Sequence, residues 1–325
     1  MIIKKHPYDN TIKAAYFRHN IFYYKISANF YIILNDSSIN SSHKLFYLST
    51  ILNYINLNGK ITDAAAAAMP VDNGAFRYGY GLFETMLVQD GVIRLGQYHW
   101  ERLFAGTVTL NFELPALMTP EYLEKEVLQT VKKNKLEKLC RVRLQLFAGG
   151  GGLYGRESNK PGFVIECFPL DEITLQLNEN GLVAGIATGV AKTVDTLCNL
   201  KSCNALIHAM AAQQAMANKW NDAIICNSEV RMIESTVANI FWIKDYIVYT
   251  PPLKDGCVAG VMRRHVLETT TVKEKSLTIM ELLQADEVFL TNAIKQVRWV
   301  SNINKSRYGN EQTRHIHNLL NSRQA

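Results

Sequence analysis

The sequence predicts an α+β fold with two domains, and two observations lead to this prediction. The expected strands follow one another in hairpins instead of alternating with helices in regular βαβ units, which argues against a doubly wound parallel sheet. The chain has 325 residues, of which 48% are apolar and 20% are charged. Such a composition is typical of a soluble globular protein, and the length suffices for two ordinary domains.

Residues 1–53 differ from the rest of the chain in composition. They are rich in Ile, Tyr, Phe, Asn, Lys and Ser, and they contain no Gly, Glu, Val or Cys. The apolar stretch Ile26–Leu34 is short and no convincing small-residue cleavage site follows it, which argues against a signal peptide. We therefore predict an N-terminal extension over 1–53, either an appended segment or the product of a start codon placed too early.

A first domain is expected over residues 54–169. Gln89-Asp90-Gly91 separates two apolar runs, and Asp-Gly between such runs is a strong hairpin signal. His99, Arg102, Leu103 and Gly106 recur at helical spacing. The predicted elements are, in order, strands at Phe83–Val88 and Val92–Leu95, helices over 97–110 and Tyr122–Asn134, and strands at Arg141–Phe147 and Gly162–Phe168.

A second domain is expected over residues 173–325, after a boundary at Pro169–Glu172. The Ala-rich run Ser202–Lys219 has strong helix formers and neither Gly nor Pro, so it predicts a helix. The other expected elements are a strand at Leu182–Ala187, strands before and after Glu234, a turn at Pro251-Pro252, a helix from near Gly260, and a helix end followed by two strands within 281–300.

Charge and cysteine usage exclude some classes of protein. The formal charge of +6 comes from scattered basic residues, so it discriminates little between an anionic small molecule and a nucleic acid. The six cysteines form no C-x-x-C pair and do not cluster with the eight histidines, so we expect no metal site. Free thiols in a reducing cytosol explain them most simply. No apolar run reaches the roughly 18 residues that a membrane span needs.

Two ionisable residues stand in unusual places. Lys201 comes at the start of the predicted Ala-rich helix, where the positive end of the helix dipole disfavours a cation and lowers its pKa. A lysine that loses its proton can form a Schiff base. Glu234 lies between two expected strands among apolar residues, so if buried it is expected to face a cationic partner. Taken singly, each is more often a solvated surface residue or a turn residue.

The surroundings of this pair carry a resemblance to a known family. Lys201-Ser202-Cys203-Asn204-Ala205-Leu206 is followed about thirty residues later by Glu234, Asn239 and Phe241. This pattern resembles the fold-type IV, or class IV aminotransferase, family of pyridoxal-phosphate (PLP) enzymes. The match runs from about Ile55 to Val300, roughly three-quarters of the chain.

The resemblance implies a role for each matching residue. Lys201 would hold the cofactor and move protons at the substrate's α-carbon, and Glu234 would meet the ring nitrogen. Arg102, in a His99-x-x-Arg102-Leu103 motif, would bind the cofactor phosphate. The remaining cofactor-binding positions implied by the family are Gly260, Val261 and Met262 at a helix start, Thr291 after an apolar strand, and Asn239.

Several residues resemble one branch of the family, the 4-amino-4-deoxychorismate lyases. Thr85 ends Gly81-Leu82-Phe83-Glu84-Thr85, where branched-chain transaminases usually have Gly, and its hydroxyl could relay a proton. Thr291-Asn292-Ala293 and Gly260-Val261-Met262-Arg263 are also nearer the lyase pattern, and Ala205 departs from the Tyr of many branched-chain enzymes.

Other positions depart from the lyase pattern. Phe147 and Gly152 stand where lyases tend to carry arginines that grip substrate carboxylates. Arg141, Arg143 or Arg156 are candidates to replace them. Tyr80 replaces the Asp of the common G-D-G turn.

The first functional prediction is a lyase that forms 4-aminobenzoate and pyruvate from aminodeoxychorismate. One alternative is a branched-chain or D-amino-acid transaminase that uses 2-oxoglutarate, and another is a PLP-binding protein without turnover. The resemblance also implies a small N-terminal α/β domain, a larger C-terminal pseudo-barrel domain, and the cofactor between them. We expect a cytoplasmic homodimer that acts on a small amino compound and binds neither nucleic acid nor membrane.

Overall fold

The computed structural model describes residues 12–18, 21–26, 29–34, 46–47, 54–150, 154 and 159–322. The chain divides into two compact units, Met1–Asn53 and Tyr54–Ala325. The first unit contains an antiparallel sheet in the order β1-β2-β3-β4. Its strands are β1 (Ile12–Arg18), β2 (Ile21–Ile26), β3 (Asn29–Leu34) and β4 (Phe46–Tyr47). The interpretation of residues 1–53 as an extension stays a prediction.

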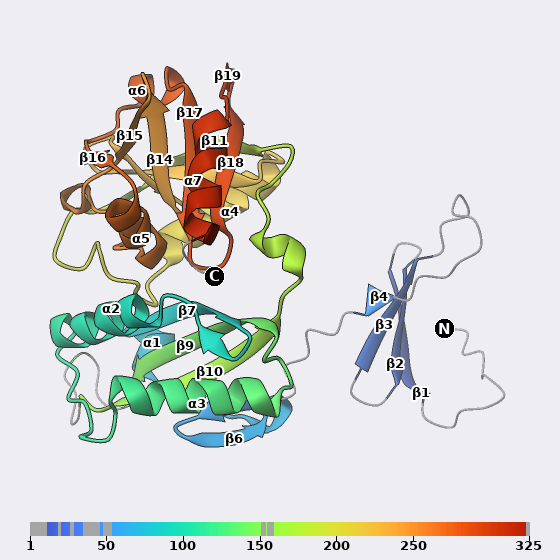
Figure 1. Ribbon diagram of the computed structural model, residues 1–325. Coiled ribbons are helices and arrows are strands. Elements are labelled where there is room, and N and C mark those ends of the chain that lie inside the picture. The colour runs from blue at the N-terminus through green and yellow to red at the C-terminus, as the bar shows by residue number, and fades with distance from the viewer. Residues whose placement is uncertain are drawn as a thin grey trace. The chain divides into compact units, whose positions relative to one another are not determined.

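The second unit begins with a six-stranded sheet in the order β6-β5-β10-β9-β7-β8 (Figure 1). Its strands are β5 (Tyr54–Leu57), β6 (Lys60–Asp63), β7 (Gly81–Gln89), β8 (Val92–Ile93), β9 (Leu139–Ala148) and β10 (Pro161–Pro169). Asp90 and Gly91 both have positive φ in the β7–β8 turn, as a two-residue hairpin requires. This hairpin was predicted, and the structure confirms it.

Two helices, α2 (Gly96–Thr109) and α3 (Pro120–Lys133), pack against one face of this sheet. Alternate residues of β7 and β9 point into the core below the helices, and the buried side chains Met86 and Leu144 are examples. The residues between them, such as Phe83 and Arg143, point to the opposite face. That opposite face therefore carries Phe83, Thr85 and Arg143.

The second sheet has nine strands, six of which close into a ring. They follow the order β13-β12-β11-β18-β17-β14, and β14 pairs with β13 through Glu234 and Asn239. The strands of this sheet are β11 (Leu182–Lys192), β12 (Asp222–Asn227), β13 (Met232–Ser235), β14 (Asn239–Lys244), β15 (Ile247–Thr250), β16 (Val272–Glu274), β17 (Glu287–Asn292), β18 (Gln296–Ile303) and β19 (Ser306–Arg307). The predicted α+β class with a barrel-like second part is confirmed.

Apolar side chains fill the barrel and also cover it from outside. Ile224, Ile240, Leu290 and Val300 belong to one buried cluster that includes strands from around the ring. The helices that cover the barrel are α4 (Leu206–Ala217), α5 (Val261–Thr269) and α7 (Glu311–Ser322), and the shorter helices of the unit are α1 (Gly74–Tyr78) and α6 (Ile279–Leu283). Small alanines of α4 let that helix lie close to β11 and β12.

The start of the Ala-rich helix differs from the prediction. The helix was expected from Ser202, but α4 begins at Leu206. The residues before it do not join the helix because their backbone bonds to β7: Phe83 N–H donates to the Lys201 carbonyl and Cys203 N–H donates to the Gly81 carbonyl, each at 2.9 Å. The prediction that Lys201 opens this helix was therefore wrong.

The C-terminal helix α7 was not predicted. The Glu287 carboxylate on β17 accepts hydrogen bonds from the backbone N–H groups of Gln312 and Thr313, at 2.9 Å each, and from the Thr313 hydroxyl at 2.7 Å. These bonds satisfy donors at the start of α7. Asn310, a residue type common at helix starts, and the spacing of Ile316, Leu319 and Leu320 are local signals of this helix that the prediction overlooked.

Candidate active site

The amine of Lys201 lies in an enclosed environment between two arginines and two carboxylates. It stands 4.5 Å from the centre of the Phe83 ring. Burial is the main reason why the pKa of Lys201 falls from 10.5 to about 8, and the charge of Arg102 is the next. Arg143 also lowers this pKa, whereas Glu84 and Glu234 raise it. The lowered pKa agrees with the direction predicted from the sequence, but its cause is burial and neighbouring charge instead of a helix dipole.

Glu234 lies within β13 and is almost completely buried. Its Oε1 accepts hydrogen bonds from Lys192 Nζ at 2.6 Å and His208 Nε2 at 3.0 Å, and its Oε2 accepts one from the backbone N–H of Val258 at 2.7 Å. Burial alone raises the pKa of Glu234, but His208 and Lys192 together outweigh it and the pKa falls below its ordinary value. Glu234 is therefore a carboxylate at neutral pH.

Glu84, His99 and Arg102 form a buried charged cluster between β7 and α2. Arg102 binds both Glu84 oxygens, with Nε at 2.7 Å from Oε1, and its third nitrogen donates to the Ala259 carbonyl at 3.0 Å. His99 Nδ1 lies 2.6 Å from Glu84 Oε2. Burial raises the pKa of Glu84, but the charges of Arg102 and His99 and their hydrogen bonds bring it down to about 2. Glu84 is therefore a carboxylate paired with Arg102 at neutral pH, whereas burial lowers the pKa of His99 below its ordinary value.

The start of α5 lies next to two neighbouring strands of the barrel. Asn239 on β14 pairs directly with Thr291 on β17. The Thr291 hydroxyl is buried and has no hydrogen-bond partner among the described residues. A Cβ on Gly260, which caps α5, would come within 1.8 Å of Asn239 Oδ1. Val261 and Met262 form the first turn, where backbone N–H groups can bind an anion.

Thr85 and Arg143 face each other on the polar side of the first sheet. They are direct cross-strand partners in β7 and β9. The Arg143 guanidinium lies 3.9 Å from the centre of the Phe83 ring, the same ring that Lys201 contacts. A guanidinium and an amine therefore meet at one phenyl ring, and Thr85 is the strand partner of that guanidinium's residue.

The other positions compared with the lyase pattern lie elsewhere. Arg141 stacks on Phe168 at 4.2 Å, and Phe147 is buried. Gly152 and Arg156 lie outside the described residues. Of the two candidate replacements that the structure describes, Arg143 lies near Lys201 and Arg141 stacks elsewhere.

Tyr80 has a structural explanation that the sequence did not offer. Its ring stacks on Phe112 with centroids 5.4 Å apart, and its hydroxyl donates to the Leu110 carbonyl at 2.5 Å. Tyr80 therefore ties the turn before β7 to the end of α2.

Sequence reasoning missed three residues that hold the predicted ones in place: Glu84, Lys192 and His208. Glu84 had a detectable signal, because it occupies an inward position in an otherwise apolar strand, between Leu82 and Met86. Lys192 and His208 had none, because they lie 42 and 26 residues from Glu234 in the sequence.

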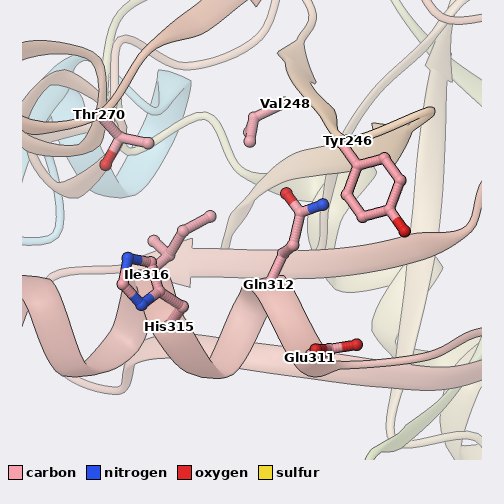
Figure 2. Close-up of a pocket in the computed structure, with 7 residues that line it drawn as sticks. All are labelled: Tyr246, Val248, Thr270, Glu311, Gln312, His315 and Ile316. Atoms are coloured by element: carbon pink, nitrogen blue, oxygen red, sulfur yellow. The ribbon is translucent and has the colours of Figure 1, made fainter.

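Metal sites, membrane spans and surface pockets are the other features that could indicate a function. In the part of the chain that the structure describes, no three His, Cys, Asp or Glu side chains group in a way that could hold a metal ion. No described helix is both long and apolar enough to cross a membrane. Figure 2 shows a surface pocket of about 490 Å³ beside α7, and none of the residues predicted from the sequence lines it. Its lining residues are Tyr246, Val248, Thr270, Glu311, Gln312, His315 and Ile316.

Comparisons with known proteins were made against family models, curated sequences and solved structures. A family model described as amino-transferase class IV matches residues 81–303. An aminodeoxychorismate lyase from Vibrio harveyi is 30% identical over 240 residues, which cover 72% of this chain and 87% of the relative. A putative branched-chain-amino-acid aminotransferase from Methanocaldococcus jannaschii is also 30% identical, over 270 residues that cover 81% of this chain and 92% of the relative.

Solved structures show the same fold. A branched-chain aminotransferase from Thermoproteus uzoniensis superposes with a TM-score of 0.74 and 24% identity, over 82% of this chain and 93% of that one. A putative 4-amino-4-deoxychorismate lyase from Legionella pneumophila gives a TM-score of 0.71 and 25% identity, over 80% of this chain and 96% of that one. Both kinds of relative therefore share the barrel and the six-stranded sheet.

Proposed function

Because this chain belongs to the class IV aminotransferase family, we propose that it is a lyase acting on aminodeoxychorismate, which releases pyruvate and forms 4-aminobenzoate. The observation that carries the proposal is the pairing of Thr85 with Arg143 beside the ring that Lys201 contacts. A hydroxyl and a guanidinium at this place suit a substrate that bears carboxylates and must exchange a proton as it breaks apart.

Members of the family use PLP, and the residues of this chain fit that cofactor. Among the residues that the structure describes, none bonds to the buried Thr291 hydroxyl, and the approach of Asn239 to Gly260 leaves room only for glycine at the helix start. When bound, PLP supplies a ring that draws electrons from the substrate's α-carbon. We propose that the α5 start, Thr291 and Arg102 hold its phosphate.

The roles of the remaining residues follow from their surroundings. Lys201 is proposed to hold the cofactor and to accept the proton of the substrate carbon that bears the amino group, since a lysine of pKa about 8 is partly neutral near physiological pH. Glu234 is proposed to meet the ring nitrogen as a carboxylate. Thr85 is proposed to relay a proton to the departing pyruvate carbon, and Arg143 to bind a substrate carboxylate.

A second candidate function is amino-acid transamination with 2-oxoglutarate. Its support is the Methanocaldococcus jannaschii relative, which is as similar as the lyase and is covered over more of its length. A third possibility is a protein that binds PLP without turning over a substrate.

Parallel assays on one purified preparation separate the three candidates. The proposed lyase forms 4-aminobenzoate from aminodeoxychorismate, and Thr85→Val slows this reaction while cofactor absorbance is kept. Glutamate formed from Leu, Ile, Val or D-Ala with 2-oxoglutarate, without 4-aminobenzoate, would establish the transaminase instead. Cofactor absorbance with neither product would support the third possibility, and Lys201→Ala is the inactive control in each assay.

We propose that the protein is a cytoplasmic homodimer. Exposed apolar side chains support a subunit interface: Phe76 on α1 is 79% exposed and Leu206 at the start of α4 is 68% exposed. The two helices are close, because a Cβ on Gly79 would lie 3.0 Å from Asn204. The six cysteines are all free thiols, which supports a reducing compartment. Sedimentation as a monomer would contradict the dimer.

A further inference from the structure

The Glu234 carboxylate accepts a hydrogen bond from a buried lysine, Lys192. Lys192, the last residue of β11, places its Nζ 2.6 Å from Glu234 Oε1, and both residues are more than nine-tenths buried. The strand β12 lies between them: Lys192 is level with Asn227 and Glu234 with Ile225 on that strand. The pair is therefore set by the register of three neighbouring barrel strands, and Lys192 is distinct from Lys201.

Counting hydrogen bonds shows what remains available on this carboxylate. An ionised carboxylate offers about four acceptor positions, two on each oxygen. Lys192 and His208 occupy those of Oε1, and the backbone N–H of Val258 occupies one of Oε2. One position on Oε2 is left for a further donor. The positive charge of the Lys192 ammonium and the negative charge of the Glu234 carboxylate cancel, so the pair is neutral.

We propose that Lys192 is a positioning residue that acts on the cofactor through Glu234: its ammonium balances the carboxylate charge, so that the ring nitrogen meets a neutral ion pair instead of a bare anion. The inference rests on the proposed function, in which Glu234 meets the ring nitrogen. A bare carboxylate holds a proton on a neighbouring nitrogen strongly, and a balancing cation weakens that hold. Lys192 thus sets how strongly the ring draws electrons.

Other ionisable groups around Glu234 do not provide this balance. His208 on α4 bonds to the same oxygen at the longer distance of 3.0 Å, and its side chain is 22% exposed, against 10% for that of Lys192. Cys257 is a buried thiol whose pKa is raised to about 12, so it is neutral. Lys201 is influenced by Glu234, but its role in holding the cofactor makes its own charge variable. Lys192 is the fixed cation that touches the carboxylate.

The test follows the ring nitrogen directly. The enzyme is loaded with PLP that carries ¹⁵N in the ring, and the ¹⁵N resonance is recorded over a pH series for the wild type, Lys192→Gln and Lys192→Arg. Gln keeps a hydrogen-bond donor and removes the charge, so the apparent pKa of the ring nitrogen is expected to rise by about one unit or more. Arg keeps the charge and is expected to stay near the wild type. A wild-type resonance in a folded Lys192→Gln enzyme would overturn the inference.

A second pair of variants covers the case in which Lys192→Gln does not fold. The single variant Glu234→Gln and the double variant Lys192→Gln/Glu234→Gln contain no unpaired buried carboxylate. The ¹⁵N resonance of the double variant is expected to lie closer to the protonated position than that of the single variant. If the ¹⁵N resonance is the same in these two variants, the inference is overturned.

The same experiment separates this inference from the site on which it rests. If Glu234→Gln leaves the resonance where the wild type has it, Glu234 does not meet the ring nitrogen and the proposed site is wrong. If Glu234→Gln displaces the resonance and Lys192→Gln does not, only the role of Lys192 is wrong.

Discussion

Lys201 shows how much a residue's chemistry depends on contacts that lie far from it in the sequence. Its carbonyl accepts a hydrogen bond from Phe83 of β7, and its side chain lies over the Phe83 ring and near Arg102 and Arg143. Burial and these cations lower its pKa to about 8. A neutral amine is the form that attacks a carbonyl carbon, so the same contacts make Lys201 reactive.

This environment predicts the pH dependence of cofactor capture. Below the Lys201 pKa of about 8 the rate at which cofactor-free enzyme binds PLP covalently should rise roughly tenfold per pH unit, and above it the rate should level off. Stopped-flow absorbance measures the rate, and Lys201→Ala should show no borohydride-reducible attachment. A rise that continues toward 10.5, the ordinary lysine value, would show that the amine is not perturbed.

Arg102 offers a second prediction at the level of one residue. Three of its N–H groups bind Glu84 and Ala259, which leaves two for a phosphate. Arg102→Ala should weaken PLP binding by about 1.5–3 kcal/mol, the range for charge-assisted hydrogen bonds. Arg264→Ala is the matched control, since Arg264 is a half-exposed arginine of α5 that pairs with Glu101 and Glu268. Equal affinities of the two variants would remove Arg102 from the phosphate site.

Among the secondary-structure elements, α5 combines tight packing with a binding role. Gly260 has φ −70°, so its backbone would accept alanine, but an added Cβ would meet Asn239 Oδ1. Asn239 would have to move and lose its 2.9 Å bond to the Val258 carbonyl. The glycine is therefore required by close packing and not by an unusual backbone angle.

Gly260→Ala should destabilise the protein by about 1–3 kcal/mol, the usual cost of overpacking, and should weaken PLP binding as well. Urea unfolding and equilibrium cofactor binding measure the two effects. Gly96→Ala is the control, because a Cβ at this first residue of α2 would meet its neighbours at 3.7 Å or more, an ordinary contact. A Gly260→Ala enzyme as stable as Gly96→Ala would contradict the packing argument.

Local patterns predicted the elements whose determinants are local. The Asp90-Gly91 turn and the helix around Arg102 are where the sequence places them, because turn chemistry and apolar spacing are written into neighbouring residues. Helix α7 was overlooked although Asn310 and the apolar spacing after it indicate a helix, whereas the start of α4 escaped prediction because β7 sets it from a distance. The same applies to the candidate site: motifs indicated Lys201 and Glu234, but the contacts of Lys192 exist only once β11, β12 and β13 are aligned.

At the scale of the whole molecule, the ionised Glu84 cluster links folding to pH. The folded pKa of Glu84 is about 2 and its ordinary value is 4.5, so its stabilisation is present above 4.5 and is lost as the pH falls from 4.5 toward 2. The difference between these two pKa values corresponds to about 3 kcal/mol in the free energy of unfolding. Glu84→Gln should therefore lose less stability than the wild type over this interval. Urea unfolding at a series of pH values measures the free energy of unfolding, and the same pH dependence in both proteins between 4.5 and 2 would contradict the prediction. Glu281, whose pKa is also lowered to about 2, contributes equally to both proteins.

The ring of six strands has a further consequence for how the protein responds to its ligand. The pairing that completes the ring joins Glu234 to Asn239, one residue proposed to meet the cofactor ring and one that packs against the helix proposed to hold its phosphate. A ligand that contacts both of these residues stabilises the pairing of β13 with β14, and separation of the two strands would release the ligand. Thermal tolerance of the protein should accordingly track cofactor occupancy, with the saturated form melting later than the stripped one.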